Sequence, residues 1–152
     1  MAQFYDFIAP TINEAVHNYI SAKFGRWDDS DNYIPPDVDT VRPWAIDTVQ
    51  IWRGNQRALM GLSSAQWQDL AYAGKAAHCR AWLADQSQPF GMTREAAVRG
   101  LTNVQMAELI VSQNDLWLDA NDQIDAAYTA ARAAIEAAQT VAEIEAVLAG
   151  LE

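Results

Sequence analysis

Residues 103–139 read NVQMAELIVSQNDLWLDANDQIDAAYTAARAAIEAAQ, and this stretch decides the fold class. On a helix of about 3.6 residues per turn, its larger apolar side chains recur at spacings of four and seven residues and fall on one face. We expect that face to pack against another helix; its members are Met106, Ile110, Trp117, Ile124, Tyr128 and Ile135. Eight of the 13 residues from 126 to 138 are alanine, which favours helix. The stretch therefore predicts one long helix, with a break near Asn114 or Asn121 as the alternative.

Helix starts are marked four times by a hydroxyl residue followed three positions later by glutamate or glutamine, the capping-box pattern. The pairs are Thr11 with Glu14, Ser63 with Gln66, Thr102 with Gln105 and Thr140 with Glu143. They predict helices over about 12–24, 65–84, 103–139 and 141–149, and we expect a shorter helix from Thr93 to near Gly100. We expect Gly25 to end the first helix in the left-handed conformation. The predicted fold class is mainly α, with a long helical hairpin in the C-terminal two-thirds and a small irregular or β-containing N-terminal segment.

The stretch between Gly25 and Gly61 carries turn residues and prolines. Residues 41–52 fit either a short strand pair or a fifth helix, because Pro43 argues against a helix interior but suits a first turn. We therefore predict two parts: 1–61, an aromatic-rich N-terminal segment with one helix over about 12–24 followed by loop or short strands, and 62–152, a helical hairpin with a short closing helix.

The charge of −10 is concentrated at the C-terminal end. Residues 101–152 hold nine acidic side chains and one basic side chain, whereas residues 1–100 hold 11 and nine. Because a phosphate backbone or an anionic membrane surface is bound through Lys and Arg, this balance argues against both partners. No apolar run approaches the roughly 18 residues of a membrane-spanning helix, and residues 1–6 lack the pattern of a secretory signal.

Residue patterns for catalysis, metals and cofactors are missing from the sequence. His17, His78 and Cys79 lack the spacing of a zinc site, and neighbouring helical residues such as His78 and Cys79 point about 100° apart. The aspartates from 28 to 39 miss the glycine and glutamate positions of a calcium loop. We therefore expect no enzyme, no metal and no cofactor.

Aromatic residues are unusually frequent, with six tryptophans among 152 residues, three of them between positions 27 and 52. Exposed Trp and Tyr are typical of protein interfaces and of sugar-stacking sites, and buried ones are typical of cores. Composition leaves all three uses open.

Two segments resemble a known family. The first comprises Gly25, Arg26, Trp27 and Asp28, followed by Ile34, Pro35, Pro36, Asp37 and Val38. It resembles the opening of proteins encoded beside tail-fibre genes in bacteriophages and prophages, the tail-fibre assembly or accessory family. Arg26 stands where an aromatic residue is usual, and a predicted helix precedes a motif that usually lies at the N-terminus. The alanine-rich segment 130–147 is similar to the closing helices of many phage tail proteins.

The resemblance implies a non-catalytic protein that binds a phage tail fibre or a neighbouring tail protein, as an assembly chaperone or a virion accessory component. It would act in the host cytoplasm during assembly or in the virion tail, and the long helix could also support self-association. The docking anchors would be Trp27, Tyr33, Trp44 and Trp52. The alternative is an acidic inhibitor, a DNA mimic or anti-defence protein, whose Asp115, Asp119 and Asp122 bind a basic host protein.

Overall fold

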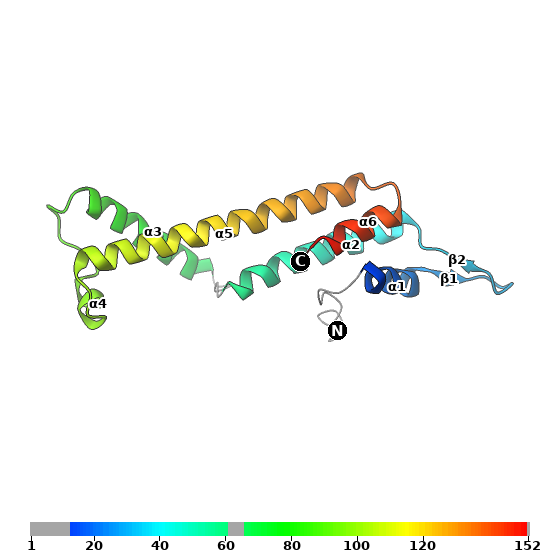
Figure 1. The fold of residues 1–152 in the computed structure, drawn as a ribbon, viewed down its shortest axis with the longest axis horizontal. Helices are drawn as coiled ribbons and strands as arrows, with labels where there is room; N and C mark the ends of the chain where they lie inside the picture. Colours follow the sequence, from blue (N-terminus) through cyan, green and yellow to red (C-terminus); the bar gives the residue numbers. More distant parts are fainter. Residues whose placement is uncertain (1–12, 61–65, 152) are drawn as a thin grey trace. The chain divides into compact units, whose positions relative to one another are not determined.

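The computed structural model describes residues 13–60 and 66–151, and within them it contains six helices and two short strands (Figure 1). In chain order these are α1 (Asn13–Phe24), β1 (Arg26–Trp27), β2 (Tyr33–Ile34), α2 (Val38–Leu59), α3 (Gln66–Ala84), α4 (Thr93–Val98), α5 (Asn103–Ala137) and α6 (Val141–Ala149). The mainly α class with a small β-containing segment is confirmed. The long helix α5 runs for 35 residues without the break considered at Asn114 or Asn121. Of the helices in the described ranges, none is both long enough and apolar enough to cross a membrane.

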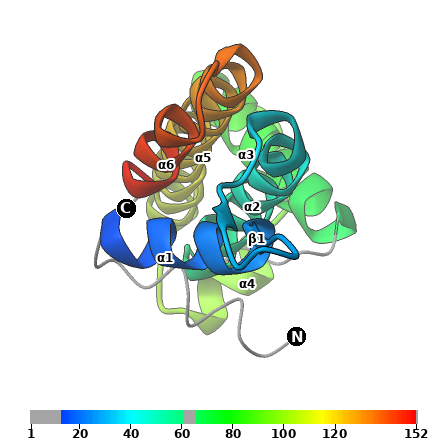
Figure 2. The ribbon, with the colours of Figure 1, turned by 90° about the vertical axis from the view of Figure 1, so that its right-hand side faces the viewer.

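The chain divides into two compact units, each with its own core. Unit 1 comprises residues 1–57 and 124–152, and unit 2 comprises residues 58–123. In unit 1 the core draws on α1, α2, the C-terminal part of α5 and α6 (Figure 2). Its buried residues are Ile20, Val41, Ala45, Val49, Ala131, Ile135, Ala138, Ile144 and Leu148. The end of the long helix and the closing helix thus share a core with residues 16–49.

Unit 2 packs α3 and α4 against the N-terminal part of α5. Its buried core residues are Cys79, Trp82, Phe90, Ala96, Met106 and Ala107. The Trp82 and Phe90 rings lie 4.6 Å apart, and the Trp82 indole N–H donates to the carbonyl of Gln88 at 2.9 Å. This bond satisfies the one polar group of the tryptophan, so a large ring can be buried without leaving a donor unpaired.

Residues 41–52 lie within helix α2, so the fifth-helix alternative is correct and the strand pair is wrong. The helix starts after Asp37, whose Oδ2 accepts the backbone N–H groups of Asp39 at 3.1 Å and Thr40 at 3.2 Å. Pro43 lies in its second turn, where the missing N–H removes a single helical bond. The buried positions recur at helical spacings of three and four, and they are Val41, Ala45, Thr48, Val49 and Trp52.

Two of the four predicted capping boxes are confirmed, at Thr102 with Gln105 and at Thr140 with Glu143. The boxes beginning at Thr11 and Ser63 involve residues outside the described ranges. The prediction that Gly25 is left-handed is wrong, because among the described glycines only Gly100 has a positive φ, of 69°. Gly100 ends α4, where its N–H and that of Leu101 bond to carbonyls of the last helical turn.

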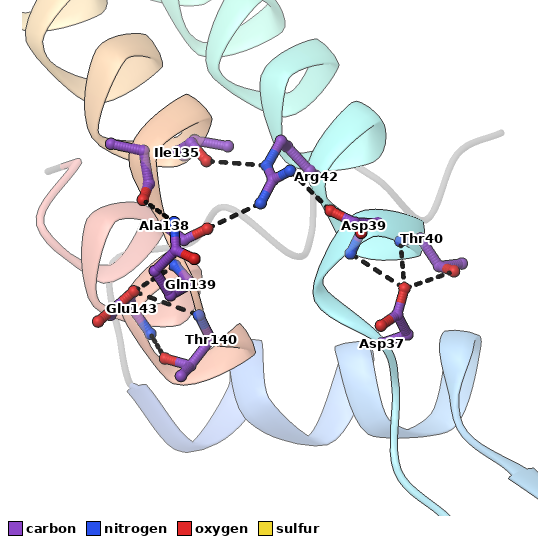
Figure 3. Close-up of polar contacts among 10 residues, drawn as sticks. Asp37, Asp39, Thr40, Arg42, Ile135, Ala138, Gln139, Thr140 and Glu143 are labelled. Carbon is purple, nitrogen blue, oxygen red and sulfur yellow. Dashed lines mark hydrogen bonds and ion pairs between the residues drawn. The ribbon is translucent and has the colours of Figure 1, made fainter.

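Arg42 of α2 holds the end of α5 (Figure 3). Its guanidinium donates to the backbone carbonyl of Ile135 at 3.2 Å and to that of Ala138 at 2.7 Å. Carbonyls in the last turn of a helix lack helical partners and carry partial negative charge. A cationic donor there supplies the missing hydrogen bonds and offsets the charge. The capping box of α6 follows at once, which fixes the sharp turn between α5 and α6.

Candidate protein-binding surface

The most exposed aromatic pair of the described residues lies on the β-hairpin of unit 1. Strands β1 and β2 are antiparallel, with Arg26 opposite Ile34 and Trp27 opposite Tyr33. The Trp27 and Tyr33 ring centroids are 5.5 Å apart and the ring planes are tilted by 59°. Cross-strand aromatic pairs of this kind stabilise a hairpin. The two rings therefore order each other although both face solvent.

The turn of the hairpin is fixed by Asp28. Its Oδ1 accepts the backbone N–H of Ser30 at 2.8 Å and that of Asn32 at 2.9 Å. These backbone hydrogen bonds lower the pKa of the Asp28 carboxyl, because they favour its charged form. Asp31 takes the left-handed conformation with a φ of 59°, which aspartate tolerates better than most residues. The turn thus has one defined geometry.

The base of the hairpin is fixed to α1. The Tyr33 hydroxyl donates to the backbone carbonyl of Ser21 at 3.0 Å. Gly25 makes this possible, since a Cβ there would lie 2.5 Å from the Ser21 carbonyl oxygen and 2.6 Å from Cε2 of Tyr33. The glycine that sequence reasoning assigned to a left-handed stop is required instead by the close approach of Tyr33.

A shallow groove of about 480 Å³ opens between α1 and the hairpin. We call it the hairpin groove; its lining residues are His17, Asn18, Ser21, Ala22, Gly25, Trp27 and Tyr33. Trp27 is 69% exposed and Tyr33 is 41% exposed. Two of the four predicted anchors are therefore brought together on one open surface.

The other two predicted anchors are placed elsewhere in unit 1. Trp44 is half-buried and stacks on Tyr19 of α1 at 5.4 Å, with Phe24 at 5.6 Å on the same ring. Trp52 is only 6% exposed because it is one of the inward-facing positions of α2. Trp52 is thus buried and Trp44 packs α2 against α1, while their role as docking anchors stays a prediction.

The predicted packing stripe of α5 faces inward along its length. Met106 and Ile135 are fully buried, one in the core of each unit. Ile110 packs against the unit 2 core and Tyr128 against the unit 1 core, while Trp117 and Ile124 are half-buried. Asp115, Asp119 and Asp122 on the opposite face are exposed.

Two of the three exposed aspartates have partners within unit 2. Asp115 forms an ion pair with Arg80, and Asp119 accepts a hydrogen bond from the Gln123 side chain at 2.9 Å. These contacts already engage two of the carboxylates that, in the acidic-inhibitor alternative, would bind a basic protein.

Of the residues considered for chemistry, Cys79 is buried in a core, whereas His17 and His78 are exposed and hydrogen-bonded. Cys79 is fully buried, and burial raises the pKa of its thiol, which disfavours the thiolate form. The neighbouring His78 accepts the backbone N–H of Gly91 through Nε2 at 3.0 Å. His17 bonds through Nδ1 to Glu145 of α6 at 2.9 Å, a pairing across 128 positions that no sequence pattern signals. Within residues 13–60 and 66–151, no group of three or more His, Cys, Asp or Glu side chains is placed to hold a metal ion.

Comparisons of this chain with protein-family models, with curated proteins and with solved structures find no match.

Proposed function

We propose that this protein works without catalysis by binding another protein through the exposed face of its hairpin, and that the partner is a phage tail fibre or a neighbouring tail protein. It would act as an assembly chaperone or a virion accessory component. One observation carries the proposal: Trp27 is 69% exposed while it stands on a hairpin that is fixed at both ends.

The energy available from Trp27 is large enough to anchor a complex. A tryptophan buries up to about 250 Å², so covering the exposed part removes roughly 170 Å² from water, worth about 4 kcal/mol at 25 cal/mol per Å². Tryptophan and tyrosine are also the residues most often found to dominate interface energies. Because the Asp28 turn and the Tyr33 hydroxyl already order the hairpin, little conformational entropy is lost when the partner binds.

The tail-fibre assignment is supported by the way in which the residues of the resemblance build this surface. Gly25 allows Tyr33 to reach α1, Trp27 is the exposed ring, and Asp28 organises the turn. Asp37, near the end of the first segment of the resemblance, caps α2. The motif residues thus lie in the hairpin and at its junctions with α1 and α2.

Co-expression with the tail fibre encoded in the same genome tests the proposal. We expect the two proteins to co-elute on size-exclusion chromatography, with comparable recovery at about 0.1 M and about 1 M salt, because apolar burial is not screened. A complex that dissociates steeply with salt and survives the Trp27→Ala change would support the acidic-inhibitor alternative instead. Absence of the tail fibre from the complex at both salt concentrations would refute the assignment.

A further inference from the structure

We propose that unit 2 carries an acid-sensitive tether: protonation of His78 releases the loop of residues 85–92 from α3 at Gly91. This loop connects α3 to α4, and the hydrogen bond between Gly91 and His78 is one of the contacts that hold it against α3. The His78 side chain is exposed, so solvent protons reach its ring. The loop belongs to unit 2, so this device does not depend on the hairpin of unit 1.

The bond between Gly91 and His78 exists only while the imidazole is neutral. The Gly91 backbone N–H donates to Nε2 at 3.0 Å, so Nε2 presents its lone pair and the ring proton resides on Nδ1. In the imidazolium both nitrogens carry hydrogen, and the Nε2–H group would then face another donor. Because a backbone N–H cannot accept a hydrogen bond, protonation removes this bond rather than rearranging it.

The loop is shaped for this close approach to the imidazole. A Cβ on residue 91 would lie 3.1 Å from Nε2 and 3.4 Å from Cε1 of His78, so glycine allows the backbone to reach the ring edge without a side chain between them. The His78 ring also stacks on Phe90, with centroids 5.7 Å apart and planes inclined by 27°. His78 thus contacts two consecutive residues of the loop.

The other bonds of the loop do not respond to this proton. The Trp82 indole donates to the Gln88 carbonyl at 2.9 Å, and the Phe90 ring is buried in the unit 2 core. Hydrogen bonds from Ser87 lower the pKa of the Asp85 carboxyl, so this group stays ionised across the range in which histidine titrates. We therefore expect loosening around Gly91 and not unfolding of unit 2.

Protonation of His78 gains no new ionic partner in the closed loop. The charged side chains on the surrounding elements of unit 2 are the ion pairs Lys75–Glu95 and Arg80–Asp115, together with Asp85, Arg94 and Glu108. Among the described residues, none of these side chains forms an ion pair with the imidazole. The lost hydrogen bond is therefore uncompensated, and acid favours the open loop.

Amide hydrogen exchange of the full chain, followed by NMR at about pH 7.5 and about pH 5.5, tests the tether on both sides of the ordinary histidine titration. We expect the protection of the Gly91 amide, relative to an unstructured peptide at the same pH, to fall about three- to tenfold, as for loss of one hydrogen bond. The Met106 amide, which bonds to the Thr102 carbonyl at 2.9 Å, is the internal reference and should change less than about twofold. An equal fall at Met106 would indicate general loosening and would contradict the proposal.

Two substitutions at His78 isolate its proton. His78→Gln offers a side-chain oxygen in place of Nε2 and does not titrate, so the protection of Gly91 should become independent of pH. His78→Phe keeps a ring against Phe90 but offers no acceptor, so Gly91 should be weakly protected at both pH values. His17→Gln, which changes the histidine of unit 1, is the matched control and should keep the response of the parent chain.

The imidazole nitrogen resonances of His78 give a readout that needs no variant. At neutral pH they should report a neutral ring with its proton on Nδ1, and their titration should share its midpoint with the loss of protection at Gly91. Different midpoints, or equal protection of Gly91 at the two pH values, would overturn the proposal. So would a parent-like pH response in either His78 variant, or its loss in His17→Gln.

Discussion

Replacing Arg42 with methionine removes the cation that holds the C-terminal end of α5, while it keeps an unbranched side chain of similar length. The guanidinium makes bonds of 3.2 Å to the Ile135 carbonyl and 2.7 Å to the Ala138 carbonyl. Hydrogen bonds from charged donors contribute roughly 1.5–3 kcal/mol each, and since the Arg42 side chain is 25% exposed, water can partly replace it. We therefore expect Arg42→Met to lower the free energy of unfolding by about 2–3 kcal/mol.

Urea denaturation followed by circular dichroism measures this loss. With an m-value of roughly 2 kcal/mol per M, the midpoint should fall by about 1 M. The control is Asp39→Asn, which breaks the exposed ion pair between Asp39 and Arg42 but leaves both carbonyl bonds in place, so the loss should stay below about 0.5 kcal/mol. Equal losses in the two variants, or a loss below about 0.5 kcal/mol in Arg42→Met, would refute the assignment of Arg42 as the cap of α5.

Three further perturbations follow from the cores and helix ends. Ile135→Ala leaves a cavity in the unit 1 core and should lower the free energy of unfolding in urea by about 2–5 kcal/mol. Leu116→Ala, at a side chain that is 70% exposed, should lower it by less than about 0.5 kcal/mol. Similar losses in the two variants would contradict the burial of Ile135. Gly100→Ala should cost about 1 kcal/mol in the same assay, because φ is 69° and the added Cβ meets no described residue beyond its chain neighbours within 4 Å. Gly100→Asn should recover part of this loss if backbone strain is the cause. The hydrogen bond from Lys75 lowers the pKa of Glu95 below its ordinary 4.5. The resulting stabilisation is therefore present above pH 4.5 and is lost as the pH falls through the lower pKa of the folded state. Lys75→Met should lose this pH-dependent stabilisation in acid unfolding, and an unchanged acid unfolding curve would contradict the assignment.

The helices were predictable because their signals are local. The boxes at Thr102 and Thr140 satisfy backbone donors within one turn, so three-residue spacing suffices to place them. The inward stripe of α5 follows from helical geometry in the same way. Helix α2 was ambiguous because Pro43 lowers local helix propensity, and burial of one face of α2 in the unit 1 core overrides that preference.

The candidate binding surface was only partly predictable, because the exposure of a side chain depends on the tertiary structure around it. Trp27 and Trp52 lie in equally aromatic sequence, yet one is on a hairpin and the other is on the inward face of a helix. The bonds that fix the surface, from Tyr33 to Ser21 and from His17 to Glu145, join segments with no shared pattern. Gly25 did signal a backbone constraint, but its cause, the nearby Tyr33 ring, lies eight positions along the chain.

The most direct test of the docking surface is the affinity of the purified tail fibre for Trp27→Ala and Tyr72→Ala, measured side by side by calorimetry. Both changes remove an exposed aromatic ring, of 69% and 65% exposure, but only Trp27 lies on the hairpin groove. We expect Trp27→Ala to weaken binding by at least about 2 kcal/mol, or roughly thirtyfold, and Tyr72→Ala to leave it unchanged. Equal affinities of the two variants, or a loss confined to Tyr72→Ala, would contradict the account.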